Sequence, residues 1–368
     1  MRLEKLQLNG FRNYESATLE FKKQVVCFLG KNGAGKTNLL DAIHYLSFTK
    51  SALIPNDAAN VKDDLDQFVI RGDFRLNGLC YDTACSYRSG AKKVLRVDGQ
   101  DVPRMADHIG RFPVVMVTPN DIELIWDGSE LRRRFFDSMI SQIDRTYLDK
   151  LMLYNHLLKQ RNSLLRLSDD QEIDKDLLDT YDQPLADAGT YIASARSTFV
   201  KSFAIHLQTY YSYLGDNDRE DTGLHYQSEV PGKDFREMLK GALKKDLALQ
   251  RTTLGIHRDD FQFILNSHEL RKYGSQGQQK TFLIALKLAE FKSIALAKGT
   301  KPLLLLDDIF DKLDDDRIAR LIKMVGRDDF GQLFITDARP DRSMGLLKEA
   351  NIHPELFQVE NGNVTYLP

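Results

Sequence analysis

One eight-residue segment constrains the fold of this chain more than any other feature, because it fits the pattern G-x-x-x-x-G-K-[ST] at every position. It follows an apolar stretch, residues 25–29, and precedes a stretch with helical spacing, residues 37–46. Glycines in such a loop let several N–H groups point at one phosphate, and the helix adds the positive end of its dipole. The segment consists of Gly30, Lys31, Asn32, Gly33, Ala34, Gly35, Lys36 and Thr37. It predicts an α/β fold that binds a nucleoside triphosphate; the alternative is an ordinary glycine-rich turn between a strand and a helix.

Four side chains are expected to carry the chemistry of this site. Lys36 places a positive charge on the β- and γ-phosphates, and Thr37 offers its hydroxyl to Mg²⁺. A carboxylate for the same metal should follow another buried strand, and the four leucines at 303–306 are followed by Asp307 and Asp308. We expect Asp307 to hold Mg²⁺, directly or through water, and Asp308 to polarise the attacking water. Apolar strands also end in acids at ordinary turns, which is the alternative for this pair.

A second candidate anion site opens the helical pattern of residues 276–296. It offers a serine hydroxyl, a glycine N–H and a helix N-terminus, which together suit a phosphate. The residues are Ser275, Gln276, Gly277 and Gln278. Because one chain binds only one γ-phosphate, this site is predicted to serve the ATP held by another copy of the chain. A capped helix after a glycine turn is the alternative.

Length and composition restrict the class of protein. The 368 residues suffice for two or three domains, or for one large domain with an insertion. Lys+Arg 51 against Asp+Glu 53 excludes a globally basic, histone-like protein, though not a local basic patch. Cys27, Cys80 and Cys85 form no Cys-x-x-Cys pair, so a zinc ribbon or disulfide framework is not predicted, and a reducing cytosol is the simplest location. The first residues lack a signal-peptide core and no apolar run could span a bilayer, so we expect a cytoplasmic protein without membrane contact.

The order of patterns along the chain indicates an α/β domain interrupted by a helical insertion. The first third is rich in alternating strand patterns, with a hairpin predicted at Asn77-Gly78. The middle third has apolar residues at helical spacing over 147–165 and 185–214, which predicts two long antiparallel helices separated by a polar, acidic stretch, 168–182. The last third returns to α/β. We therefore expect residues 1–119 to form the first lobe, 120–248 an inserted helical arm, and 249–368 the second half of the divided domain.

These motifs together resemble the ATP-binding-cassette (ABC) ATPases of the SMC type. Within that group, three further strings are similar to the RecF family of bacterial recombination mediators: residues 8–14 (LNGFRNY), 132–137 (RRRFFD) and 255–260 (GIHRDD). The resemblance covers essentially the whole chain. It implies an α/β fold, an ABC-type P-loop ATPase head of two lobes split by an inserted helical arm.

The resemblance also implies roles for individual residues. The loop at 30–37 corresponds to Walker A, Asp307 and Asp308 to Walker B, and residues 275–278 to the signature motif that completes a partner's site. Arg12 is similar to a basic residue near the nucleotide in SMC-type heads. The D-loop, which crosses the dimer interface, is implied at Asp311, Leu313 and Asp314. Asp308 stands where transporters have glutamate and Thr336 where they have a switch histidine, so hydrolysis is expected to be slow.

The function implied by the resemblance is that of an ATP-dependent DNA-binding protein of recombinational repair. ATP with Mg²⁺ would close a homodimer on gapped DNA or on single-strand/double-strand junctions, and weak DNA-stimulated hydrolysis would reset it. Together with partner mediators of the RecO/RecR type it would load the recombinase, and so support replication restart and the SOS response. Two alternatives are an ATPase subunit of an ABC membrane transporter and a scaffold that binds ATP without hydrolysing it.

Two basic clusters are candidates for DNA contact, because neutralising phosphates requires lysine and arginine. The first lobe contributes Arg88, Lys92, Lys93 and Arg96, and the start of the arm contributes Arg132, Arg133 and Arg134. A solvated charged face is the alternative for each cluster. For His257 with Arg258, two possibilities stay open: an approach to the nucleotide, or the fixing of a turn.

Overall fold

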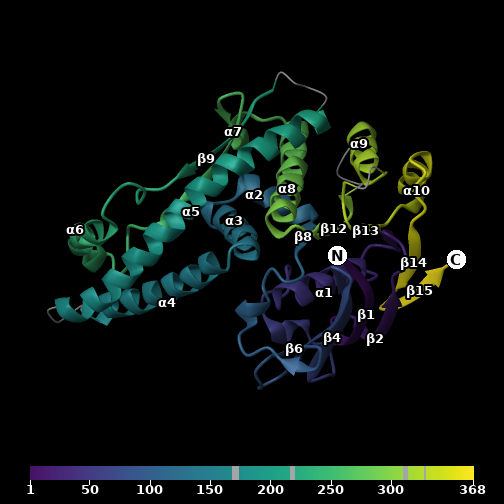
Figure 1. Ribbon diagram of the computed structural model, residues 1–368, viewed down its shortest axis with the longest axis horizontal. Coiled ribbons are helices and arrows are strands. Elements are labelled where there is room, and N and C mark those ends of the chain that lie inside the picture. The colour runs from purple at the N-terminus through teal and green to yellow at the C-terminus, as the bar shows by residue number, and fades with distance from the viewer. Residues whose placement is uncertain (168–173, 216–219, 310–313, 327–328) are drawn as a thin grey trace. The chain divides into compact units, whose positions relative to one another are not determined.

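The structure is a computed structural model that describes residues 1–167, 174–215, 220–309, 314–326 and 329–368. The chain divides into two compact units, whose elements are labelled in Figure 1. Unit 1 comprises Met1–Ile122, Tyr210–Asn217 and Lys280–Pro368, and unit 2 comprises Glu123–Thr209 and Asp218–Gln279. Unit 1 thus joins the two ends of the sequence, as expected for an α/β domain that an insertion interrupts.

A six-stranded sheet forms the centre of unit 1, with the order β15-β14-β3-β13-β12-β8. All neighbouring strands pair in parallel except β14 and β15, which form an antiparallel hairpin. Every residue of β3, β8 and β12 is buried, which explains why these strands read as continuous apolar runs instead of alternating ones. The strands are β3 (Val25–Leu29), β8 (Val114–Val117), β12 (Leu303–Leu306), β13 (Leu333–Asp337), β14 (Glu355–Glu360) and β15 (Asn363–Leu367).

An antiparallel sheet of six strands, in the order β2-β1-β4-β5-β6-β7, forms the second layer of unit 1. Buried and accessible residues alternate along β4, as expected for a strand with one face on the core. One continuous apolar core contains side chains from both sheets and from α1 (Lys36–Phe48). The strands are β1 (Arg2–Phe11), β2 (Tyr14–Glu20), β4 (Gln67–Leu76), β5 (Leu79–Arg88), β6 (Val94–Val97) and β7 (Gln100–Asp101).

Unit 1 contains three further α-helices among its described residues. α8 (Gln276–Lys298) begins in unit 2 and continues into unit 1, and most of its unit 1 portion up to Ile294 is buried. The other two are α9 (Asp315–Gly326) and α10 (Pro340–Glu349). Across the described residues, none of the helices has an apolar stretch long enough to cross a membrane.

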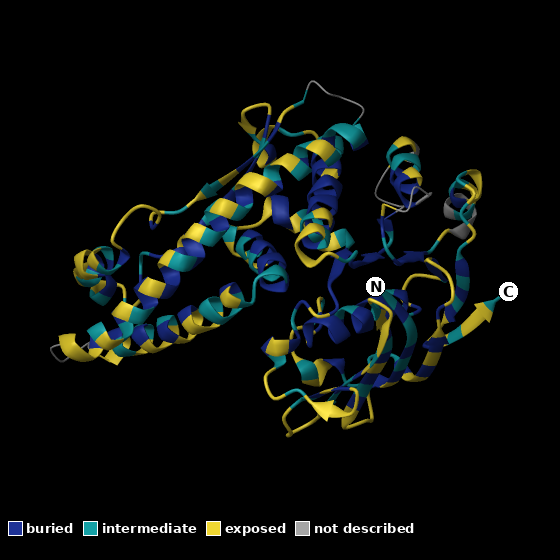
Figure 2. Cartoon of the chain, in the orientation of Figure 1, coloured by how far each residue is buried: buried dark blue, intermediate teal, exposed yellow. Residues whose placement is uncertain are grey.

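Two long helices, α4 (Arg145–Leu167) and α5 (Lys175–Gly215), dominate unit 2 and lie side by side in Figure 1. Their contacts show the antiparallel arrangement that the sequence predicts, since Arg161 near the end of α4 binds Asp182 near the start of α5, whereas Tyr147 binds Arg196. The faces turned toward each other are buried and the outer faces exposed (Figure 2). The remaining elements are α2 (Glu123–Trp126), α3 (Ser129–Ile143), β9 (Thr222–Gln227), α6 (Phe235–Ala248), β10 (Asp260–Leu265), β11 (His268–Glu269) and α7 (Leu270–Tyr273).

The structure differs from the sequence prediction at the start of α5. The acidic stretch predicted to separate the two long helices is helical from Lys175 onward. Two of its carboxylates form ion pairs with arginines elsewhere in unit 2, which the polarity of the stretch alone does not indicate. Asp179 pairs with Arg236, and Asp182 pairs with the fully buried Arg161. The Asp174 side chain also accepts from the N–H groups of Asp176 and Leu177, and so caps the helix.

The division into units also differs from the expected boundary at residue 249. Residues 249–279 group with unit 2, because β10 pairs with β9 and β11 to form a separate three-stranded sheet. The signature segment before α8 therefore lies in unit 2, whereas the phosphate loop lies in unit 1. The final hairpin, β14–β15, was not anticipated from the sequence.

Candidate nucleotide-binding site

The phosphate loop connects β3, at the centre of the parallel sheet, to the N-terminus of α1. Gly30, Gly33 and Gly35 all have positive φ, at 156°, 81° and 114°, and the latter two lie in the region that favours glycine. Lys31, Asn32 and Gly33 are exposed at the tip, while Ala34 is buried. A side chain at position 30 would clash with the carbonyl oxygen of Val359 in β14, so the loop starts in close contact with a neighbouring strand.

The ammonium group of Lys36 lies inside this loop. Its Nζ donates to the carbonyl oxygens of Gly30, at 2.9 Å, and Lys31, at 3.1 Å, and the residue is only 4% exposed. A buried ammonium requires such partners, because an isolated charge away from water is costly. The charge is therefore held at the centre of the loop by two groups that a phosphate oxygen can replace or supplement.

Thr37 and Asp307, which are 270 residues apart, meet at this site. The Thr37 hydroxyl lies 2.8 Å and 3.1 Å from the two carboxylate oxygens of Asp307. Parallel pairing explains the meeting, because β3 and β12 both pair with β13 and end at the same edge of the sheet. Burial raises the pKa of Asp307, and hydrogen bonds from Thr336 and Thr37 counter part of that rise.

Thr336, at the end of β13, connects the two acids. Its buried hydroxyl donates to Oδ1 of Asp307 at 2.7 Å and accepts from the backbone N–H of Asp308 at 2.9 Å. Asp308 has a φ of 44°, which is uncommon for a non-glycine residue and typical of sites where the surroundings fix the backbone. Thr336 therefore does more than stand in the place of a switch histidine: it orients both acids.

Arg12 is held near the start of α1 by a dense set of contacts. Its guanidinium forms an ion pair with the fully buried Asp41 at 2.6 Å and donates to Ser51 at 2.9 Å and Asn60 at 3.0 Å. A longer contact, 3.3 Å, reaches Asn38, one residue after Thr37. The structure thus places Arg12 beside the helix that carries the phosphate loop.

Sequence reasoning missed the residues that brace the loop from outside. Asn13 and Tyr14, at the turn between β1 and β2, donate to the carbonyl oxygens of Ala34 and Gly35. The N–H of Gly362, in the turn of the final hairpin, also donates to Ala34. The string at residues 8–14 contains Asn13 and Tyr14 as well as Arg12, so it was the available signal for two of these residues.

The signature segment forms a capping box at the start of α8. The N–H of Gln278 donates to the Ser275 hydroxyl at 3.2 Å, and the Gln278 side chain accepts from the N–H of Ser275 at 2.7 Å. Gln278 also donates to Glu220 at 2.6 Å. Ser275 and Gln276 are exposed, and Gly277 is partly so. The alternative predicted for this segment, a capped helix, is thus present, and the cap leaves the serine at the surface.

Part of the D-loop lies outside the described residues, namely Asp311 and Leu313. Asp314 is exposed and its side chain accepts from the N–H of Arg317, which caps α9. It also forms an ion pair with the Arg317 guanidinium. The structure therefore gives Asp314 a local role at the start of a helix.

The arginine run at the start of the arm differs from the expected cluster of DNA contacts. Arg132 is 9% exposed and binds both carboxylate oxygens of Asp260, at 2.8 and 3.0 Å, as well as the carbonyl oxygens of Leu124 and Asp127. Arg133 donates to Ser129 and to the carbonyl oxygen of Asp259. Arg132 is thus a structural side chain and not a DNA contact. Its partner Asp260 lies 128 residues away along the chain, so the sequence of the run gives no sign of this ion pair.

The basic residues of the first lobe divide in the same way. Lys93 donates to Asp57 at 2.8 Å and to the carbonyl oxygen of Thr49 at 2.5 Å, and so ties the antiparallel sheet to the end of α1. Lys92 is exposed, and three exposed arginines each pair with a nearby acid. These pairs are Arg88 with Asp66, Arg96 with Asp101, and Arg134 with Glu130. Exposed pairs of this kind are weak, so these arginines can exchange their acid for a phosphate.

In the structure His257 holds a turn, which is one of the two possibilities that the sequence leaves open. Its ring lies 2.8 Å from the Tyr154 hydroxyl through Nδ1 and 3.1 Å from the carbonyl oxygen of Thr252 through Nε2. Burial lowers the pKa of His257 to about 4, so the ring is neutral at pH 7. Arg258 beside it is exposed.

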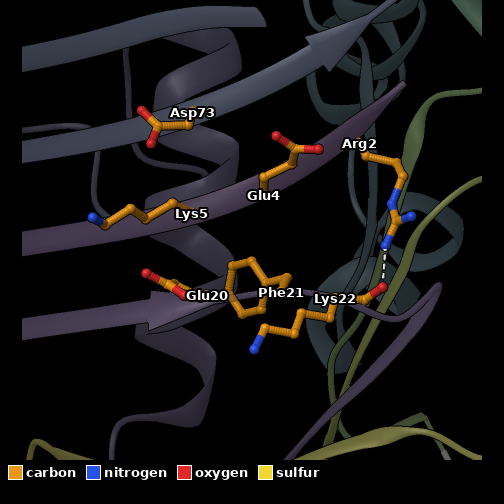
Figure 3. A pocket seen from close by; sticks show the side chains of 7 residues that line it. All are labelled: Arg2, Glu4, Lys5, Glu20, Phe21, Lys22 and Asp73. Carbon is orange, nitrogen blue, oxygen red and sulfur yellow. Dashed lines mark hydrogen bonds between the residues drawn. The ribbon is translucent and has the colours of Figure 1, made fainter. Parts of the chain in front are cut away.

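A shallow pocket of about 550 Å³ lies on the antiparallel sheet of unit 1 (Figure 3). Its lining mixes basic and acidic side chains around Phe21: Arg2, Lys5 and Lys22 with Glu4, Glu20 and Asp73. Arg2 donates to the carbonyl oxygen of Lys22, a bond drawn in Figure 3, and Glu4 pairs with Arg75. The pocket shares no residue with the phosphate loop, and its balanced charges select no particular ligand.

Comparison with known proteins agrees with the geometry. The sequence matches the family described as AAA domain over residues 5–324. The DNA replication and repair protein RecF of Cytophaga hutchinsonii is 43% identical over 100% of this chain and 97% of the relative, and that of Flavobacterium johnsoniae is 41% identical over 98% and 100%. A solved structure described as the recombination mediator protein RecF-ATPrS in the RecFOR pathway is 31% identical, covers 100% of this chain and 98% of the other, and has a TM-score of 0.90.

The fold is shared more widely than the sequence. An Smc head domain from Pyrococcus furiosus is 14% identical, with 99% of this chain and 95% of the other covered and a TM-score of 0.56, which shows the fold alone. Relatives at about 40% identity, by contrast, match this chain over nearly its whole length. This chain therefore belongs to the RecF family of DNA replication and repair proteins.

Proposed function

We propose that this chain binds ATP at the phosphate loop and uses it as a switch for DNA binding in recombinational repair. The observation that carries the proposal is the contact between Thr37 and Asp307, at 2.8 Å, beside the buried ammonium of Lys36. It brings together a hydroxyl, a carboxylate and a cation, the groups that P-loop enzymes apply to a triphosphate. The solved relatives described as RecF-ATPrS and RecF-ATP support the choice of nucleotide.

Mg²⁺ fits the same residues. Thr37 and Asp307 offer hard oxygen donors, and Mg²⁺ is commonly bound by one or two carboxylates together with phosphate oxygens. The raised pKa of Asp307 reflects burial, a cost that a divalent cation would offset. When bound, the ion neutralises charge that develops on the phosphates.

The residues of this chain would contribute to hydrolysis in separate ways. Lys36 binds the β- and γ-phosphates, and Asp308 orients and polarises the attacking water. An aspartate side chain is shorter than a glutamate by one methylene, so its reach toward the water is limited and turnover is slow. ATP then serves mainly as a switch, in a weak DNA-stimulated ATPase.

The signature segment supports an ATP-dependent homodimer. Ser275 is exposed at the N-terminus of a 23-residue helix, where a hydroxyl and N–H groups favour an anion. In the dimer it would bind the γ-phosphate of the ATP held by the other copy. The D-loop residues Asp311, Leu313 and Asp314 would lie at the same interface.

The DNA ligand would be a gap or a single-strand/double-strand junction, held through exposed basic groups such as Arg88, Lys92, Arg96 and Arg134. Since one solved relative is described as a recombination mediator in the RecFOR pathway, we propose partners of the RecO/RecR type and a role in loading the recombinase. Replication restart and the SOS response are the processes that this role would serve, in the cytoplasm. The full-length relatives argue against a transporter subunit.

The test is sedimentation of the full chain with ATP, ADP or no nucleotide, each with and without gapped DNA. We expect dimers with ATP only, and tighter dimers with gapped DNA. Ser275→Arg should leave ATP binding intact and abolish the dimer, whereas Ser202→Arg, at another exposed serine of unit 2, should not. ATP-dependent dimers of Ser275→Arg would contradict the proposed interface. Equal ATP turnover with and without DNA, at the background rate, would favour the non-hydrolysing scaffold.

A further inference from the structure

The carbonyl groups at the end of the phosphate loop are held by donors from two distant turns of unit 1. The Ala34 carbonyl accepts from Nδ2 of Asn13 at 3.1 Å and from the N–H of Gly362 at 3.2 Å. The Gly35 carbonyl accepts from the Tyr14 hydroxyl at 2.9 Å, in addition to two N–H groups of α1. Tyr14 is fully buried, so its hydroxyl is held in place by the core around it.

The orientation of these carbonyls fixes the orientation of the next N–H groups. A peptide group is planar and trans, so the carbonyl of residue 34 and the N–H of residue 35 point in opposite directions. The N–H groups of Gly35 and Lys36 therefore point away from Asn13, Tyr14 and Gly362. Both stand at the first positions of α1, where N–H groups lack an acceptor within the helix and are available to a phosphate.

Close packing shows that the arrangement is specific. A side chain at position 35 would clash with the Asn13 amide and approach the Tyr14 hydroxyl, so the two braces occupy the space beside this glycine. A side chain at Gly362 would clash with the backbone carbonyl of Asn13. Asn13 also accepts from the Asn38 side chain at 2.7 Å, which fixes the direction of its amide. The brace thus leaves Asn13 little freedom to point elsewhere.

We infer that Asn13, Tyr14 and the hairpin turn at Gly362 are positioning groups for nucleotide binding. They hold the Ala34–Gly35 and Gly35–Lys36 peptides with their N–H groups toward the α- and β-phosphates, before any nucleotide arrives. The inference rests on the proposed function, since it requires that the loop binds a nucleoside di- or triphosphate. It assigns to Asn13 and Tyr14 a role that is distinct from that of Arg12 beside them.

The test compares the Kd of Mg²⁺-ATP and Mg²⁺-ADP for the full chain and three variants. Asn13→Ala removes one of the two donors to Ala34 and should weaken both nucleotides about tenfold, because one phosphate contact loses its alignment. Tyr14→Phe should weaken both about threefold, since Gly35 keeps its two helical donors. Equal losses for ATP and ADP are expected because these N–H groups serve the phosphates that both nucleotides share.

Tyr45→Phe is the matched control, because it removes another buried tyrosine hydroxyl of the same core, one bonded to Asp57 and Lys93 instead of the loop. It should lower the melting temperature at least as much as Tyr14→Phe while leaving both Kd values unchanged. Unchanged Kd values for Asn13→Ala and Tyr14→Phe, or equal losses in Tyr45→Phe, would overturn the inference. If the unaltered chain bound neither nucleotide, the proposed function itself would fail. If Asn13→Ala did not fold, the comparison of Tyr14→Phe with Tyr45→Phe would still decide.

Discussion

Replacing Thr336 with valine tests whether this residue places the two acids that follow β12. The side chain is fully buried, and its hydroxyl joins the Asp307 carboxylate at 2.7 Å to the Asp308 N–H at 2.9 Å. Valine keeps the shape of threonine but removes both bonds. A hydrogen bond to a charged group contributes about 1.5–3 kcal/mol, and an unsatisfied buried N–H costs about 1–3 kcal/mol. Since part of this loss will be relieved by relaxation, we expect a stability loss of about 3 kcal/mol.

The functional effect should exceed what stability alone explains. Without the bond to its N–H, Asp308 loses a support for its φ of 44°, and a misplacement that costs 1.4 kcal/mol in the transition state slows turnover about tenfold. The affinity for ATP without Mg²⁺ should change little, because the phosphate loop keeps all its contacts. Guanidinium unfolding, ATP titration and single-turnover hydrolysis separate the three effects.

Thr336→Ser is the control, because it keeps the hydroxyl and loses only a methyl group, at a cost of about 1 kcal/mol. It should hydrolyse ATP at nearly the rate of the unaltered chain. If the valine variant hydrolysed ATP normally while losing stability, Asp308 would not depend on Thr336. If serine behaved like valine, the methyl group and not the hydroxyl would be responsible.

Two further predictions concern stability. Arg132→Ala should destabilise unit 2 by about 3 kcal/mol, because it leaves Asp260 without its bidentate partner. The control Arg134→Ala, at an exposed ion pair, should change stability by less than about 0.5 kcal/mol. Equal denaturation midpoints for the two variants would contradict the structural role of Arg132. Burial lowers the pKa of His108, whose Nε2 lies 2.7 Å from the Leu46 carbonyl oxygen, to about 4. Between pH 6.5 and 4 the unfolded chain therefore binds a proton that the folded chain does not, and stability falls as pH falls. His108→Gln should remove on the order of 3 kcal/mol of this pH dependence, measured by urea unfolding at several pH values; an unchanged pH profile would show that folding does not lower the pKa of His108.

The sequence predicts those parts of the fold and site that depend on local pattern. The loop at 30–37, the apolar strands and the long arm helices are visible because glycine spacing and apolar periodicity lie within one short window. Asp307 could be found because the chemistry of the loop requires an acid after a buried strand. The predicted α/β fold class is confirmed by the similarity to the solved RecF structure, with a TM-score of 0.90.

What the sequence does not predict depends on partners far away along the chain. The run Arg132 to Arg134 appears available for DNA until Asp260 and the Asp259 carbonyl are placed beside its first two members. The acidic start of α5 appears to be a linker until Arg161 and Arg236 are paired with it. Local polarity indicates a solvated segment in both cases, whereas long-range ion pairs decide the outcome.

The hairpin β14–β15 has a consequence for how the protein is made. The phosphate loop leaves the ribosome early, but its partners are synthesised late. The strand before the loop, β3, pairs with β13 and β14, and the Ala34 carbonyl accepts a hydrogen bond from the N–H of Gly362. A nascent chain of which only the first lobe and the arm have been synthesised therefore lacks the strands that flank β3, and it lacks Asp307, the acid beside Thr37. Because contacts between distant segments form late and slowly, the ATP site is completed only after nearly the whole chain has been synthesised, so nucleotide cannot assist the earlier steps of folding.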